Sequence, residues 1–180
     1  MAKKALVILA EGFEEIEAMT IVDVLRRADI KVTTAGLPGT IVESSRKVKV
    51  LADTKIDDVK EKDYCAIVLP GGSPGYTNLA RSKKILQIID DFFKEKKLVA
   101  AICGAPFVLA QAGILTNVKA TIYPGMERHL PKPRPERIVV DGNVITSQGP
   151  GTAMDFSLKI VEYLAGKAMM NDVKEQLLVG

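Results

Sequence analysis

The chain contains a single histidine, His129, among its 180 residues. Protein zinc sites are commonly built from several histidine and cysteine side chains, and this sequence offers no cluster of histidines. We therefore expect no metal. The histidine lies in a proline-rich loop, where it reads as a surface residue better than as a catalytic base.

Cysteine is nearly as rare, with only Cys65 and Cys103. The N-terminal Met-Ala-Lys-Lys runs directly into a strand-like segment without a signal-peptide cleavage site. This predicts a cytoplasmic protein with free thiols rather than a structural disulfide. Cys65 lies in the run Tyr64–Leu69, which is apolar on both faces, and we expect it to be inert core packing.

Long apolar runs and a strong net charge are also missing. The longest runs are of strand length, far below the roughly 20 residues that a membrane helix needs. The formal net charge is +3, which gives no strong case for a nucleic-acid or membrane partner. The basic run Lys94–Lys97 fits a solvated helix end better than a binding patch.

The remaining composition is that of an ordinary soluble protein, and we expect one domain over residues 1–180. Strand-like runs at 5–9, 31–35, 65–69 and 98–102 alternate with helical patterns at 14–28, 82–96, 107–112 and 153–164. That alternation predicts an α/β fold with a doubly wound, mostly parallel sheet. Shorter strands are expected at 48–51 and 120–122, a hairpin at 138–146 and a closing helix at 169–179.

The strand-like run that ends at Cys103 is followed at once by Gly104, Ala105 and Pro106. A cysteine in such a place is often only a small buried hydrophobe. Here, however, the pattern of strand, tight elbow and helix start lifts a side chain above the end of a sheet. The N–H groups of the helix N-terminus favour a thiolate there, so we predict that Cys103 is reactive.

Three glycine-bearing turns, at 12–17, 71–75 and 149–152, each follow a strand-like segment. Because the carboxyl ends of parallel strands meet at one sheet edge, we expect these turns to converge on Cys103. A glycine turn is most often a simple chain reversal. At this edge, the backbone N–H groups of Gly71, Gly72 and Gly104 become candidate oxyanion donors.

Several blocks resemble the DJ-1/ThiJ/PfpI superfamily, with order and spacing that match from about residue 4 to residue 165. They are Glu14-Glu-Ile-Glu17, Val68-Leu-Pro-Gly-Gly72, Ala100-Ala-Ile-Cys-Gly-Ala-Pro106 and Thr146-Ser-Gln-Gly-Pro-Gly-Thr152, which includes Gly149 and Pro150. The branch they resemble most is that of DJ-1 and bacterial YajL.

The resemblance implies a flavodoxin-like sandwich, a homodimer and a reactive Cys103 with Glu17 as the carboxyl group beside the sulfur. It also implies that the partner subunit's Arg46 approaches the site. Activities reported for this branch are cofactor-free glyoxalase and deglycase chemistry, redox sensing by sulfinate formation, and chaperone-like protection.

Two positions depart from the superfamily's patterns. Gly104 stands where the protease-like branch has a histidine, which disfavours a Cys–His peptidase or hydrolase. Tyr123 stands where better-studied members of the DJ-1 branch have a histidine near the cysteine. Whether Tyr123 or His129 replaces that histidine is left open by the sequence, and Glu17 is therefore the leading candidate for proton transfer.

The sequence thus supports two functions. The first is a cofactor-free enzyme that converts small reactive 2-oxoaldehydes to 2-hydroxy acids, with a Cys103 thiolate as nucleophile and Glu17 as proton shuttle. The second is an oxidative-stress sensor or chaperone-like protein in which Cys103 is oxidised to sulfinate.

Overall fold

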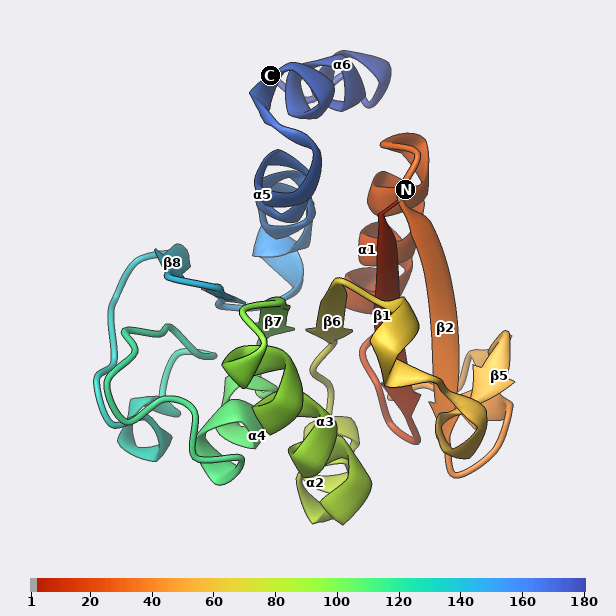
Figure 1. Cartoon of the computed structure of the whole chain (residues 1–180), viewed down its shortest axis with the longest axis vertical. Helices are drawn as coiled ribbons and strands as arrows, with labels where there is room; N and C mark the ends of the chain where they lie inside the picture. Colours follow the sequence, from red (N-terminus) through yellow and green to blue (C-terminus); the bar gives the residue numbers. More distant parts are fainter. Residues whose placement is uncertain (1–2) are drawn as a thin grey trace.

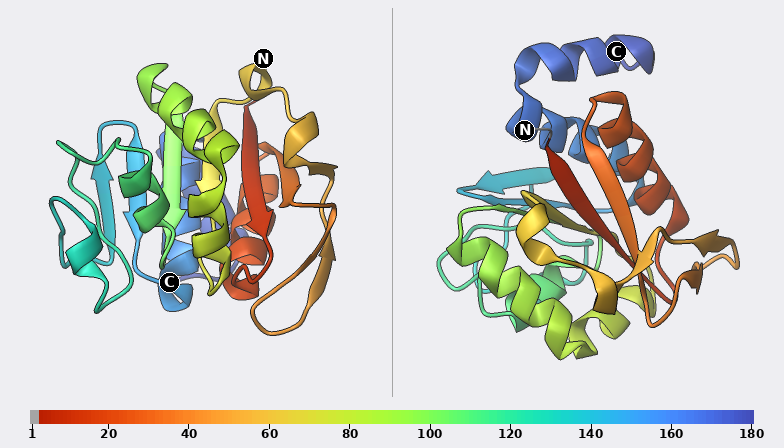
Figure 2. Two further views of the ribbon diagram at one scale, coloured as in Figure 1. Left: turned by 90° about the horizontal axis from the view of Figure 1, so that it is seen from below. Right: turned by 45° about the vertical axis from the view of Figure 1, so that its right-hand side comes forward.

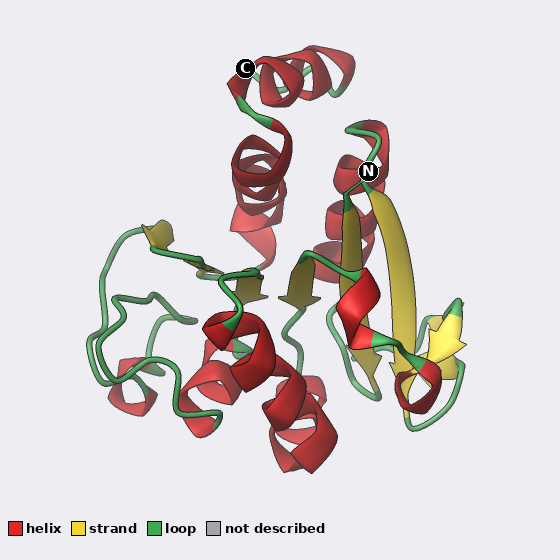
Figure 3. Ribbon diagram, viewed as in Figure 1, coloured by secondary structure: helices red, strands yellow, loops and turns green. Residues whose placement is uncertain are grey.

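The computed structural model describes residues 3–180. Figure 1 shows the chain as a sheet flanked by helices, and Figure 3 separates helices, strands and loops by colour. The helices are α1 Glu15–Arg27, α2 Gly75–Arg81, α3 Lys83–Lys94, α4 Pro106–Gln111, α5 Ala153–Ala165 and α6 Lys167–Gln176. The strands are β1 Lys4–Ala10, β2 Lys31–Leu37, β3 Ile41–Glu43, β4 Lys49–Leu51, β5 Thr54–Lys55, β6 Ala66–Leu69, β7 Leu98–Ile102, β8 Ile138–Asp141 and β9 Val144–Ser147.

The main sheet has seven strands in the order β5-β2-β1-β6-β7-β9-β8. Every neighbouring pair is parallel except β8 and β9, which form the expected hairpin at one edge. The mostly parallel, doubly wound sheet is therefore confirmed. From β1, the chain winds first to β2 on one side and later to β6 on the other. Such a reversal of winding direction is where open α/β sheets bind ligands.

Helices cover both faces of the sheet, which explains the continuous apolar strands. In β1, Ala5, Val7 and Leu9 pack toward α1 and α5, while Leu6 and Ile8 pack toward α3 and α4. All five are fully buried. The left-hand view of Figure 2 shows α3 and α4 in front of the strands and α1 and α5 behind them. A strand buried on both faces needs this unbroken apolar run.

Some local expectations were wrong. Residues 120–122 do not form a strand, because only Ala120 makes a bridge, to Pro133. The short strand expected at 48–51 is confirmed as β4, which pairs with β3 in a separate two-stranded sheet. Cys65, just before β6, packs against the core but is partly exposed rather than fully buried. Within residues 3–180, no helix has both the length and the apolar character to cross a bilayer.

Candidate active site

The Cys103 elbow is held by backbone hydrogen bonds on both sides. Cys103 has φ of +63°, a left-handed conformation that is costly for a residue with a side chain. Its N–H donates to the Ser147 carbonyl oxygen at 3.0 Å, and its own carbonyl oxygen accepts from Tyr123 N–H at 2.8 Å. These contacts to two neighbouring segments hold the strained residue where β7 ends, just before α4 begins.

Glu17, in the first turn of α1, lies against the same cysteine. Its side chain has no exposed surface. One carboxyl oxygen, Oε2, accepts a hydrogen bond from Gly71 N–H at 2.7 Å. The other, Oε1, is buried without a partner in the described part of the chain. A buried polar atom without a partner is rare in folded proteins and calls for a physical reason.

The two glycines after β6 take different roles. Gly71 donates its N–H to Glu17 and is therefore not free to stabilise an oxyanion, which corrects the expectation for this residue. The N–H groups of Gly72 and Gly104 face the Cys103 sulfur, where their hydrogen bonds favour a negative charge. Gly72 has φ of +92°, and a Cβ there would lie 2.4 Å from Glu14 N. Only glycine fits that position.

Burial sets the electrostatics of the Glu17–Cys103 pair. It raises the pKa of Glu17 from 4.5 to about 7, against the lowering effects of the Gly71 N–H and the Cys103 thiol. With Glu17 ionised, burial and the carboxylate charge raise the pKa of Cys103 to about 12. The pair therefore keeps at least one proton throughout the physiological pH range. The helix N-terminus alone, invoked from the sequence, does not set the ionisation of this thiol.

Above pH 7 the pair carries one negative charge, and the surroundings of the two side chains bear on which of them holds it. Glu17 is fully buried and has one N–H donor, whereas Cys103 is partly exposed and faces the N–H groups of Gly72 and Gly104. A charge is stabilised where more donors and more solvent reach it. If Glu17 Oε1 were protonated, this atom, which has no partner in the described residues, could donate a hydrogen bond to a Cys103 thiolate.

A small pocket opens above the sulfur. Its volume is about 270 Å³, and it is lined by Gly72, Ser73, Tyr76, Cys103, Gly104, Tyr123 and Met126. Its lining contains no Asp, Glu, Lys, Arg or His side chain. Sequence reasoning missed Tyr76 and Met126, which come from α2 and from the loop after residue 122. Tyr76 packs against Gly104, where an added Cβ would lie 2.6 Å from the Tyr76 ring, and no pattern in the sequence indicates this contact.

Other candidate residues lie outside this pocket. Gly149 packs behind Tyr123, with its added Cβ 3.3 Å from that ring, and Pro150 starts a 3₁₀ turn after it. His129 packs against Phe107, with ring centroids 5.2 Å apart. Arg46 is exposed in the turn between β3 and β4. Residues 3–180 hold no group of three or more His, Cys, Asp or Glu side chains that could bind a metal.

The chain is similar in sequence and fold to several known proteins. The chain is 45% identical over 184 residues to protein dj-1beta of Drosophila melanogaster, covering 99% of this chain and 98% of that protein. The crystal structure of that relative matches with a TM-score of 0.96 and 44% identity over 100% of both chains. The structure titled Toxoplasma gondii DJ-1, oxidized, matches with a TM-score of 0.95 and 38% identity over 98% of each chain.

A further relative carries an activity in its name. The glutathione-independent glyoxalase DJR-1.2 of Caenorhabditis elegans is 36% identical over 183 residues, covering 97% of this chain and 96% of that protein. The profile of the DJ-1/PfpI family matches residues 3–163, which is most of the sequence. The chain therefore belongs to the DJ-1/PfpI family.

Proposed function

We propose that this protein is a cofactor-free glyoxalase that converts small 2-oxoaldehydes such as methylglyoxal to 2-hydroxy acids. The observation that carries the proposal is the buried Glu17 carboxyl against Cys103 at a strained elbow. The name of the Caenorhabditis elegans relative supports the same reaction. Family membership supports the broader role, which is protection against reactive carbonyls or oxidative stress.

The reaction begins when the Cys103 sulfur attacks the aldehyde carbon of methylglyoxal. The C=O π bond breaks, the oxygen takes the proton of Glu17, and a hemithioacetal forms beside a Glu17 carboxylate. The N–H groups of Gly72 and Gly104 lie on the sulfur side of the pocket, where they can stabilise the developing oxyanion. The absence of charged side chains from the pocket lining suits a small neutral substrate.

Glu17 then moves a proton between adjacent carbons. As a carboxylate, it removes the hydrogen from the carbon bonded to sulfur, which gives an enediolate. Glu17 returns this proton to the neighbouring carbon while the hydroxyl proton moves to the neighbouring oxygen, and a thioester of lactate results. Water hydrolyses the thioester and regenerates the thiol. A group with a pKa near 7 suits both the acceptance and the return of a proton at neutral pH.

The test is methylglyoxal consumption with lactate as the measured product. Cys103→Ala is expected to abolish turnover, while Cys65→Ser serves as a matched control and keeps it. Glu17→Gln should lower kcat by roughly 10²–10⁴-fold, the usual contribution of general acid–base catalysis. Lactate formation that survives Cys103→Ala would refute the mechanism.

Deglycase-type activity would use the same groups on a hemithioacetal or hemiaminal formed from methylglyoxal and another thiol or amine. The two activities separate in a preincubation experiment. If the enzyme uses only free aldehyde, the rate of lactate formation from the adduct cannot exceed the rate at which the adduct releases methylglyoxal. A rate above that limit would assign true deglycation.

An oxidation sensor is the second candidate function, favoured by the partial exposure of Cys103 and the oxidised form named for the Toxoplasma gondii relative. Peroxide would oxidise the thiolate to sulfenate and then to sulfinate, with one water formed from each peroxide. A protonated Glu17 can donate to a sulfinate oxygen. A clean gain of two oxygens at Cys103 under mild peroxide, with negligible methylglyoxal turnover, would favour this function.

A homodimer completes the proposal. Ile16 and Met19 on α1, and Ile41 and Leu51 on the β3–β4 hairpin, are 58%, 36%, 70% and 73% exposed. The hairpin is tied to the start of α1, because Ser45 Oγ donates to Glu15 Oε2 at 3.2 Å. These residues define an apolar face that a second copy can cover. Arg46, in the same hairpin, would then reach the partner's site.

A further inference from the structure

The amino ends of the parallel strands border a second cavity, at the sheet edge opposite Cys103. Its volume is about 630 Å³, and it is lined by Lys3, Lys4, Lys31, Lys62, Asp63, Tyr64, Cys65 and Lys97. We call it the lysine cavity. β7 spans the residues between Lys97 and Cys103, which places the cavity about 20 Å from the reactive sulfur at ~3.3 Å per residue.

The lining of the lysine cavity is strongly unbalanced in charge. Five lysines face one aspartate. In the part of the chain that the structure describes, Lys97 is the one lysine of the five in an ion pair, with Glu95 at 2.8 Å. The formal net charge of the whole protein is only +3. The positive charge is therefore concentrated in one concave place, where low-dielectric walls strengthen its field.

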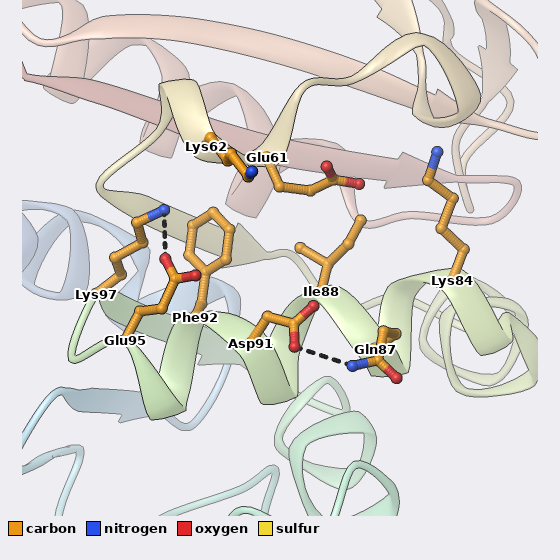
Figure 4. A pocket seen from close by; sticks show the side chains of 9 residues that line it. All are labelled: Glu61, Lys62, Lys84, Gln87, Ile88, Asp91, Phe92, Glu95 and Lys97. Atoms are coloured by element: carbon orange, nitrogen blue, oxygen red, sulfur yellow. Dashed lines mark hydrogen bonds and ion pairs between the residues drawn. The ribbon is translucent and has the colours of Figure 1, made fainter.

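Lys97 is a fixed part of this cavity. Its ammonium lies 4.8 Å from the centre of the Phe92 ring, and its side chain is only 20% exposed. Figure 4 shows the Lys97 side chain beside Phe92 and paired with Glu95. A cation held by an aromatic face and a carboxylate loses little further freedom when an anion binds. Of the basic run at 94–97, Lys97 alone is among the residues that line this cavity.

The neighbouring pocket in Figure 4 provides a contrast. It shares Lys62 and Lys97 with the lysine cavity and measures about 270 Å³. Three lysines line it, but so do three acids, Glu61, Asp91 and Glu95. Its charges are balanced, and nothing in it selects a ligand by charge. Of these two pockets, only the lysine cavity has an excess of positive charge in its lining.

We propose that the lysine cavity binds a small multivalent anion of the oligophosphate class. Lysine ammonium groups are compact point charges that bind phosphate oxygens without a fixed planar geometry. Within the described residues, four of the five cavity lysines form no ion pair, and a ligand with several negative charges would neutralise them best. The volume lies within the range of small-molecule sites. The site stands independently of the proposed carbonyl chemistry, which takes place at the other end of the strands.

The test is calorimetric titration of the whole protein with inorganic tripolyphosphate. A matched pair of double variants changes the net charge equally. Lys31→Glu with Lys62→Glu alters the lysine cavity, and Lys83→Glu with Lys167→Glu alters exposed lysines outside it. Lys31→Gln with Lys62→Gln is a milder version. Thermal melts establish that each variant folds.

We expect one tripolyphosphate per chain, with affinity that falls as salt rises. The cavity variants should bind roughly tenfold or more weakly, while the outside pair stays within about twofold of the parent. Methylglyoxal turnover should be unchanged in all of them. Equal weakening in both double variants, or no binding at millimolar tripolyphosphate, would overturn the proposal.

Two further titrations identify the source of the phosphate. Adenosine triphosphate that binds as tightly as tripolyphosphate supports recognition of the phosphate chain alone. Tighter binding of the nucleotide supports a nucleoside phosphate, with added contacts from the base or sugar. Adenosine without phosphate should not bind, and equal binding of adenosine would contradict an anion site.

Discussion

Glu17 has no exposed surface, and its Oε1 atom has no hydrogen-bond partner within residues 3–180. Burial raises its pKa to about 7, so the folded protein holds a proton that an ordinary glutamate releases near pH 4.5. The Cys103 sulfur lies beside it with two facing N–H groups. At the residue scale, the chemistry of the site depends on one proton held between these two side chains.

This shift in pKa predicts a pH-dependent stability. A carboxyl whose pKa is higher in the folded than in the unfolded state binds its proton more tightly in the folded state. The free energy of unfolding is therefore larger below pH 4.5, and this extra stability is lost as pH rises from 4.5 to about 7. The free energy of unfolding, taken relative to Glu17→Leu, should fall by about 3 kcal/mol across this window. Urea unfolding of both proteins at several pH values measures it. A difference that does not change with pH would contradict the raised pKa.

Close packing at Gly71 gives a second residue-scale prediction. A Cβ added there would lie 2.6 Å from Cys103 Cβ and 2.9 Å from the Ile102 carbonyl oxygen. Gly71→Ala should therefore cost about 1–3 kcal/mol, the usual range for overpacking. Gly151→Ala is the control, since its Cβ would meet nothing within 4 Å. Equal unfolding midpoints in urea for the two variants would rule out the clash.

At the scale of elements, α1 matters because its first turn carries Glu17. Glu14 caps the helix through a 2.8 Å hydrogen bond from Glu17 N–H to Glu14 Oε2. Acids at the start and arginines at the end also complement the helix dipole. The capping hydrogen bond therefore holds the backbone of Glu17, whose carboxyl group contacts Cys103.

Glu14→Ala should cost about 1 kcal/mol of stability, as the loss of an N-cap usually does. Asp23→Ala is the control on the same helix. It removes only an exposed ion pair with Arg27, which is worth about 0.3–0.5 kcal/mol. Chemical denaturation of the two variants provides the comparison. A smaller loss for Glu14→Ala than for Asp23→Ala would show that the cap does not stabilise α1.

The elements that were predictable from sequence are the ones with continuous or periodic apolar patterns. β1 and β7 are unbroken apolar runs because helices cover both their faces, and α3 shows its buried stripe at helical spacing. α2 and β3 were missed because they are short, and α2 follows a Pro-Gly loop. Residues 120–122 look like a strand, but their apolar side chains pack against the core without a neighbouring strand.

At the scale of the whole molecule, the topology explains why the site could be anticipated. Cys103 follows β7, Gly71 follows β6 and Glu17 follows β1, and the winding places these three strand ends side by side. The sequence could not show that Gly71 N–H is taken by Glu17, nor that Tyr76 and Met126 line the pocket. Those facts depend on side-chain packing between segments distant in sequence.

Assembly is the property of the whole molecule that the exposed apolar face predicts. Ile41→Glu with Leu51→Glu should convert the proposed homodimer to a monomer, because charges would be buried at the interface. Light scattering after size-exclusion chromatography measures the mass. Val140→Glu is the control, an exposed apolar residue on edge strand β8. A parent protein that is monomeric at all concentrations would contradict the proposed dimer.

The most direct test of the Glu17–Cys103 pair is an ultraviolet titration of the Cys103 thiolate in a Cys65→Ser background. The proposed mechanism needs a thiolate beside a protonated Glu17, so the first proton that the pair loses, with a pKa of about 7, should come from the sulfur. In Glu17→Leu the carboxyl that shares this proton is gone, so the apparent pKa of the thiol should move away from 7. A titration curve that is the same in both proteins would contradict the account.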